Sequence, residues 1–165
     1  MMAIPWLPDW YVPSWPSAED AVLALYRPLF PTGVGGAVQV VNQLPDDEAG
    51  TGWTGRILFV ARAGGAAVTV RHDQAAMQIA AITDSRADSL ILSGFVRDIN
   101  TSIEDDEIEV ELDNGSVATI TEVVEIAGPE EVPGMEYDER IIPATYLFTF
   151  ANPLETPDYS GYLGL

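Results

Sequence analysis

The first stretch of helical spacing in the chain follows Ser17. This serine is a good N-cap, and Glu19 and Asp20 come after it in the first turn, where the helix dipole favours negative charge. Apolar residues then recur at intervals of three and four, at Ala21, Val22, Leu25, Leu29 and Phe30. Pro28 and Pro31 end the segment because proline does not continue a helix. We predict a first helix here.

A second helix is predicted to begin after Ser85. Ser85 and Asp88 have the spacing of a capping box, and the helix ends near Asn100. Its apolar residues form one helical face, consisting of Ala87, Leu90, Ile91, Phe95 and Ile99.

Strands are indicated by short apolar or alternating runs between turn residues. The predicted strands are residues 37–43, 55–63, 76–83, 107–112, 117–126 and 144–151. Gly64-Gly65 predicts a turn after the second strand, and Asp113-Asn114-Gly115-Ser116 carries the Asn-Gly signal of a hairpin. In the fourth strand, Ile108, Val110 and Leu112 alternate with glutamates, which is typical of a half-buried strand.

These elements predict an α+β fold with a mixed or antiparallel sheet of five to six strands packed against two main helices. A chain of 165 residues fits one domain better than two. We predict a single domain over residues 17–152, with an extended N-terminal arm at 1–16 and a C-terminal arm at 153–165.

The N-terminal arm contains three of the four tryptophans, and its prolines disfavour both a helix and a central strand. Tryptophan and tyrosine are common interface anchors, so the arms could dock on a partner, although they could equally cover their own domain. The candidate contact residues in the two arms are Trp6, Trp10, Tyr11, Trp15, Tyr159 and Tyr162.

The net charge changes the range of functions to consider. Twenty-six acidic residues and seven arginines, with no lysine, give a net charge of −19. A field of this sign repels phosphate backbones, which argues against ordinary nucleic-acid binding. The chain has no cysteine, which excludes disulfides and thiolate chemistry. No signal peptide is recognisable, and no apolar run approaches the ~18–20 residues of a membrane span, so we expect a cytosol-like compartment and no membrane partner.

Catalytic and metal-binding patterns are weak. The sequence has one histidine, His72, next to Asp73. We predict that it is a turn residue and not part of a catalytic triad. No nucleophile elbow or phosphate loop is present. The carboxylates of Glu104–Glu107 and of Glu109, Glu111 and Asp113 could ligate a metal, but their spacing does not fit a calcium loop. We predict neither catalysis nor a cofactor or metal.

The order of elements resembles a known family. The segments that carry the resemblance are Leu58–Gly65, the strand Met77–Ile82, the turn Thr83–Arg86, the helix Ala87–Ile99 and the strand Thr145–Phe150. In this order and spacing they are similar to the tail terminator proteins of long-tailed bacteriophages and to related tail-completion proteins. The resemblance covers residues 17–152 and leaves both arms outside.

The resemblance implies a virion protein, assembled in the host cytoplasm, that forms a ring, commonly a hexamer. Such a ring caps the tail tube and joins it to the head, so its expected partners are further copies of itself, the tube protein and neck proteins. An acidic channel would let DNA pass without sticking. The candidate channel-facing residues are Glu104, Asp105, Asp106, Glu107, Glu109 and Glu111.

The alternatives use the same charge differently. The chain could be another neck subunit, such as a head-completion or stopper protein. It could also be a DNA-mimicking inhibitor of a nucleic-acid enzyme, in which carboxylates imitate phosphates. An ordinary acidic cellular domain is a third alternative. Self-association distinguishes a ring subunit from a mimic, because a ring requires it and a mimic does not.

Overall fold

The fold is taken from a computed structural model, which describes residues 6–8, 10, 15–30, 37–45, 54–69, 72–103, 107–129, 140–151 and 158–164. Its helices are α1 (Ala18–Tyr26), the 3-10 turn η1 (Arg27–Leu29), α2 (Arg86–Thr101) and the short α3 (Ser160–Leu163). Its strands are β1 (Val38–Val41), β2 (Arg56–Thr69), β3 (His72–Ile82), β4 (Ile108–Glu111), β5 (Val117–Ala127) and β6 (Ile141–Ala151).

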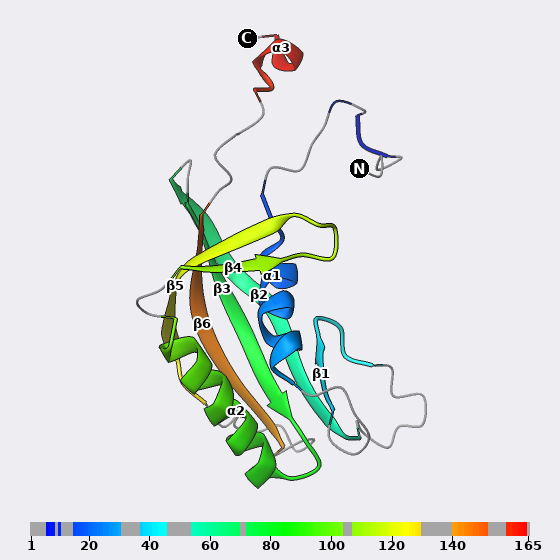
Figure 1. The fold of residues 1–165 in the computed structure, drawn as a ribbon, viewed down its shortest axis with the longest axis vertical. Helices are drawn as coiled ribbons and strands as arrows, with labels where there is room; N and C mark the ends of the chain where they lie inside the picture. The colour runs from blue at the N-terminus through cyan, green and yellow to red at the C-terminus, as the bar shows by residue number, and fades with distance from the viewer. Residues whose placement is uncertain are drawn as a thin grey trace.

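The described strands form one six-stranded sheet in the order β1-β2-β3-β6-β5-β4. The pairing of β1 with β2 is parallel and the other four pairings are antiparallel. Helix α1 contacts β1 and β2 near one edge and β4 at the other, so the sheet curls around this helix (Figure 1). An ion pair of 3.4 Å between Arg27 and Asp113 joins the end of α1 to the β4–β5 turn. The α+β prediction is therefore confirmed.

Helices α1 and α2 lie on the same face of the sheet (Figure 1). The hydroxyl of Tyr26 on α1 donates a hydrogen bond of 2.6 Å to Oδ1 of Asn100 on α2. Both helices begin as predicted, because Ser17 and Ser85 accept hydrogen bonds from the backbone N–H groups of Asp20 and Asp88. The two helices share one hydrophobic core with the facing strands.

The apolar face of α2 that was predicted from the helical spacing of the sequence is not the face that packs on the sheet. The helix buries Ser89, Leu92, Ser93, Val96 and Asn100. Of the five residues on the predicted face, Leu90, Ile91 and Phe95 are 45%, 71% and 37% exposed. Small and polar side chains suit the buried side because they allow close approach to the sheet. The Ser89 hydroxyl accepts a 3.0 Å hydrogen bond from the backbone N–H of Thr83 and shares a second, of 3.1 Å, with the Thr83 hydroxyl. Helix α2 thus has two apolar sides, and the larger residues are on the outer one.

The prediction of a turn at Gly64-Gly65 is wrong. Strand β2 continues through both glycines to Thr69, which pairs with His72, and the register shifts between Arg62 and Gly64. A Cβ at Gly65 would overlap the backbone oxygen of Gln74, and the φ of Gly65 is +116°. The glycines therefore make a bulge inside a long strand instead of ending it.

The bulge is tied to α1. Glu19 accepts a 2.8 Å hydrogen bond from the backbone N–H of Arg62 and a second, of 3.3 Å, from the side chain of Asn42. Arg62 also forms a 3.2 Å ion pair with Asp73. An acidic residue in the first turn of α1 thus holds the irregular point of β2 in place.

Two strands begin earlier than predicted. Strand β3 begins at His72, so this histidine is a strand residue and not a turn residue. Strand β6 begins at Ile141 and contains Pro143, which pairs with Ala80 of β3. The paired residues of β5 and β6 extend only as far as Thr145, so Pro143 has a neighbouring strand on one side alone, where its missing N–H is tolerated.

The predicted β4–β5 hairpin is confirmed. The backbone N–H of Gly115 bonds to the oxygen of Leu112 at 2.8 Å, and Gly115 has a φ of +80°. No described residue other than glycine has a positive φ. The turn is therefore a three-residue loop closed by a left-handed glycine, and not a type I′ turn.

Candidate interaction surfaces

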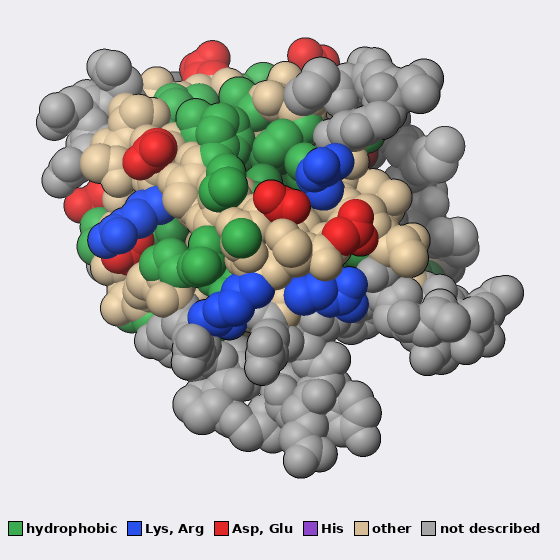
Figure 2. All heavy atoms as spheres, turned by 90° about the horizontal axis from the view of Figure 1, so that it is seen from below, with side chains coloured by type: hydrophobic (Ala, Val, Ile, Leu, Met, Phe, Trp, Pro, Cys, Tyr) green, Lys and Arg blue, Asp and Glu red, His purple; other side chains and the backbone are tan. Residues whose placement is uncertain are grey.

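The outer side of α2 forms an exposed apolar surface, which we call the α2 stripe and define as Leu90, Ile91 and Phe95. Phe95 packs against Phe30, with ring centroids 5.5 Å apart, and nearby Leu29 of η1 is 40% exposed. Seen from below, the molecule shows hydrophobic side chains interspersed with both basic and acidic ones (Figure 2). Large apolar side chains that stay exposed together on one helix make this side a candidate interface.

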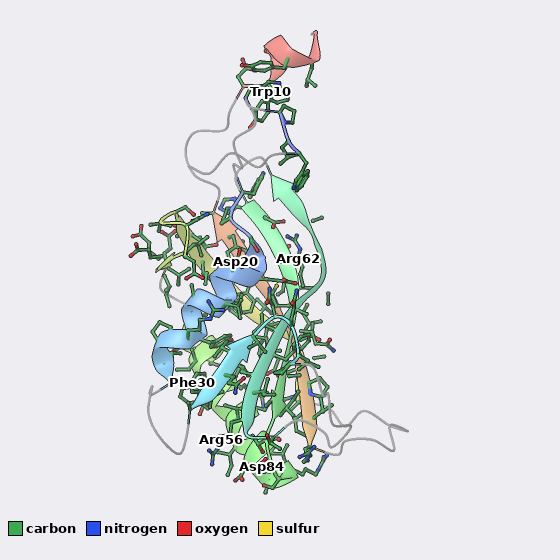
Figure 3. The ribbon with its side chains drawn as sticks, turned by 90° about the vertical axis from the view of Figure 1, so that its right-hand side faces the viewer. Trp10, Asp20, Phe30, Arg56, Arg62 and Asp84 are labelled. Carbon is green, nitrogen blue, oxygen red and sulfur yellow. The ribbon has the colours of Figure 1, made fainter. Side chains whose placement is uncertain are left out.

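The charge of α2 is balanced within the helix. It carries Arg86 and Arg97 together with Asp88 and Asp98. The start of α2 lies at the same end of the sheet as Arg56 and Asp84, opposite the end that carries Trp10 (Figure 3). Helix α2 therefore has no net charge, although the chain as a whole has a net charge of −19.

The predicted acidic surface is only partly described. Glu104, Asp105 and Asp106 lie outside the described residues. Glu109 and Glu111 on β4 are exposed, as is Glu107 just before the strand, while Val110 on β4 is buried. No arginine or lysine occurs from residue 107 to residue 129. The β4–β5 hairpin therefore has a continuous acidic edge.

Strand β5 carries a second exposed apolar group. Val117, Val124 and Ile126 are 49%, 45% and 56% exposed. Val123 belongs to the core under the helices, so its neighbour Val124 points to the opposite face of the sheet. Glu122 is exposed on that same face. Spacing did not distinguish this group, because the predicted strand was apolar on both faces.

The candidate arm residues are brought together in part. The ring of Trp10 stacks on Tyr162 with centroids 4.4 Å apart, and it lies 5.4 Å from the ring of Tyr159. Trp6 is 80% exposed, Trp15 is half-buried, and Tyr11 lies outside the described residues. The two arms thus meet each other away from the sheet, as the position of Trp10 in Figure 3 shows.

A polar cluster lies between α2, β5 and β6, with Asn100 and Tyr146 buried and the Arg97–Glu125 ion pair open to solvent. Both oxygens of Glu125 contact the guanidinium of Arg97, at 2.8 and 2.9 Å. Burial, and then the nearby Glu125 carboxylate, raise the pKa of Tyr146 to about 12. Burial also raises the pKa of Tyr26 far above its usual value. These tyrosines therefore stay neutral at physiological pH.

The surface hollow above this cluster is small. It has a volume of about 190 Å³ and is lined by Asn100, Thr101, residues 122–125 and Tyr146. Pockets for small molecules usually exceed ~300 Å³. Among the described residues, no group of three histidines, cysteines or acids is placed to hold a metal ion. No described helix is long and apolar enough to cross a membrane.

No curated protein matches the chain. A family model described as phage tail termination protein matches residues 14–157. That range holds all of the sheet, α1 and α2, and it leaves out Trp10, Tyr159 and Tyr162. The match covers most of the chain, and this protein belongs to the family of phage tail termination proteins.

Proposed function

We propose that the protein forms a closed ring, in its simplest form a hexamer, that caps the tail tube and joins it to the head. Membership of the tail termination family makes it a structural component of the virion that associates with other tail and head proteins. The family match is the observation that carries the proposal. Exposed apolar groups on α2 and β5 support self-assembly, because an isolated subunit gains nothing from leaving them in water.

The acidic edge of β4 is proposed to face the channel. Glu109 and Glu111 are exposed on the edge strand β4, Glu107 is exposed just before it, and residues 107–129 contain no arginine or lysine. DNA moving past such a surface is repelled from the wall and does not bind to it. The arms are proposed to contact neighbouring subunits or the tube, with Trp6, Trp10, Trp15, Tyr159 and Tyr162 as anchors.

The ring is tested by measuring the mass of the purified protein by light scattering, alone and with tail tubes, and by viewing the mixtures in negative stain. Rings in solution or caps on tube ends are expected. A protein that remains monomeric and leaves tube ends bare would refute the proposal and favour the DNA-mimic alternative.

The channel is tested by replacing Glu107, Glu109 and Glu111 with glutamine. Virions with the neutral surface are expected to eject DNA more slowly, and more so at low salt, because screening hides the difference at high salt. A control replaces Asp20 and Asp84 with asparagine, which removes two exposed charges outside β4 and outside α2. An unchanged rate of ejection at every salt concentration would show that the β4 glutamates do not face the channel.

A further inference from the structure

The small hollow between α2, β5 and β6 is lined by residues whose buried polar atoms have no hydrogen-bond partner in the chain. Among the residues that the structure describes, three buried side-chain atoms are in this position, namely Nδ2 of Asn100, the hydroxyl oxygen of Tyr146 and Oε2 of Glu125. All three residues line the same hollow. Buried polar groups are almost always hydrogen-bonded, either to the protein or to an ordered water molecule. The hollow is therefore a candidate binding site.

The three atoms come from three different elements. Glu125 on β5 and Tyr146 on β6 are directly opposite each other in the register of the two strands, so their side chains are neighbours on one face of the sheet. Asn100 belongs to α2, which packs on that face and holds Glu125 through Arg97. The Oδ1 of Asn100 accepts the 2.6 Å hydrogen bond from Tyr26, which leaves the two N–H groups of the same amide to be satisfied.

Burial makes it unfavourable to leave these atoms without a partner. Asn100 and Tyr146 are only 2% and 1% exposed. Burial is the main cause of the raised pKa of Tyr146, and both Glu125 and Asn100 are close enough to influence it, yet no hydrogen bond joins the Tyr146 hydroxyl to either residue. Oε2 of Glu125 has a 2.8 Å ion-pair contact with Arg97, and a carboxylate oxygen can accept a further hydrogen bond. A molecule bound to these atoms would replace the hydration that each of them loses on folding.

The three atoms also define the chemistry of the molecule that fits between them. The Asn100 amide and the Tyr146 hydroxyl can each donate a hydrogen bond, whereas the Glu125 carboxylate can only accept one. A cation cannot accept from the amide, and the carboxylate repels an anion, so the fitting molecule is neutral and both accepts and donates. Water has these properties, and buried water molecules typically make about three hydrogen bonds. A hollow of about 190 Å³ has room for it, since water takes up ~30 Å³ in the liquid.

We propose that a bound water molecule in this hollow accepts hydrogen bonds from Nδ2 of Asn100 and the hydroxyl of Tyr146 and donates one to Oε2 of Glu125. This water joins α2 to β5 and β6, and the Tyr26–Asn100 bond extends the connection to α1. The inference does not depend on the proposed ring, so either can fail without the other. A polar side chain from a neighbouring subunit is the competing occupant of the hollow.

The site is tested by a crystal structure of the purified protein at a resolution that shows ordered water. We expect a water molecule ~2.7–3.2 Å from the amide nitrogen of Asn100, the hydroxyl oxygen of Tyr146 and the nearer carboxylate oxygen of Glu125. A direct hydrogen bond between Asn100 and Tyr146, with no water in contact with both, would overturn the proposal. A side chain from a neighbouring molecule in the hollow would overturn it as well.

Two variants distinguish a specific water site from general hydration of the surface. Tyr146→Phe removes one of the three bonds while keeping the aromatic ring, and we expect the water to fall below about half of its wild-type occupancy. Thr101→Val is the matched control, because Thr101 lines the same hollow but its hydroxyl already bonds to the backbone oxygen of Arg97 at 2.9 Å. The control should retain the water.

Circular dichroism verifies that both variants fold. An unchanged water in Tyr146→Phe, or its loss from Thr101→Val, would show that the three named atoms do not hold it and would refute the inference. If Tyr146→Phe does not fold, the wild-type structure alone still decides, because it shows either the water with its three partners or one of the two outcomes that exclude it.

Discussion

The hydrogen bond between Tyr26 and Asn100 gives the sharpest test of how the two helices are held together. The hydroxyl of Tyr26 is fully buried and donates at 2.6 Å to Asn100, which is itself 2% exposed. Tyr26→Phe removes the donor and leaves Oδ1 of Asn100 without it. The Nδ2 of Asn100 already makes no hydrogen bond among the described residues.

An unsatisfied buried acceptor costs ~1–3 kcal/mol, so we expect Tyr26→Phe to lower the free energy of unfolding by about 2 kcal/mol. In a chain of this length that corresponds to a fall in Tm of roughly 4–8 °C. Asn100→Leu should cost less, about 1 kcal/mol, because it strands the Tyr26 hydroxyl but also removes the buried amide that has no partner.

Urea unfolding followed by circular dichroism measures these changes, and the double variant completes the cycle. Tyr26→Phe with Asn100→Leu should be more stable than the sum of the single effects by about 1 kcal/mol, because neither member of the Tyr26–Asn100 pair is then left as an unpaired polar group. Additive losses, or a Tyr26→Phe variant as stable as the wild type, would show that the bond does not join the helices energetically.

Three further predictions concern the bulge, the buried tyrosines and the arms. Gly65→Ala should destabilise the fold by about 2 kcal/mol because its backbone conformation and the adjacent strand exclude a Cβ. Gly94→Ala on α2, where a Cβ meets nothing, should stabilise it by about 0.5–1 kcal/mol, and equal effects in denaturant melts would contradict the bulge. Because the pKa of Tyr146 is raised to about 12, its contribution to stability is complete below pH ~10 and is lost as the pH rises through the folded value. In an alkaline absorbance titration Tyr146 should ionise only near pH 12 and Tyr26 only on unfolding, whereas joint reversible ionisation of all six tyrosines near pH 10 would refute their burial. Trp10→Ala should leave Tm nearly unchanged, since its ring contacts are with the C-terminal arm, yet reduce tube capping in negative stain; a large fall in Tm would show instead that the arm supports the domain.

Local signals in the sequence predicted most elements of the fold. Ser17 and Ser85 cap their helices because the requirement for a side-chain acceptor is met within three residues. The alternation of Val110 with its glutamate neighbours predicted which side of β4 is buried, because a strand has only two sides. These signals depend on nearest neighbours, so the chain alone contains them.

The features that were missed depend on distant residues. Gly65 was read as a turn because nothing local shows that β2 continues and passes close to Gln74. On α2, the spacing of Leu92 and Val96 is as helical as that of the α2 stripe, and the choice between the two sides depends on the sheet that receives the helix. The presence of Ser89, Ser93 and Asn100 beside Leu92 and Val96 was the available signal of a closely packed side.

The stacking of Trp10 on Tyr162 has a practical consequence for locating the subunit in a virion. Residues near the two ends of the chain are held together at one pole of the molecule, far from Arg56 and Asp84 at the other (Figures 1 and 3). A bulky label fused to either terminus would therefore mark the same pole. In micrographs of labelled particles, the side of the neck on which the label appears would give the polarity of the subunit along the tail axis.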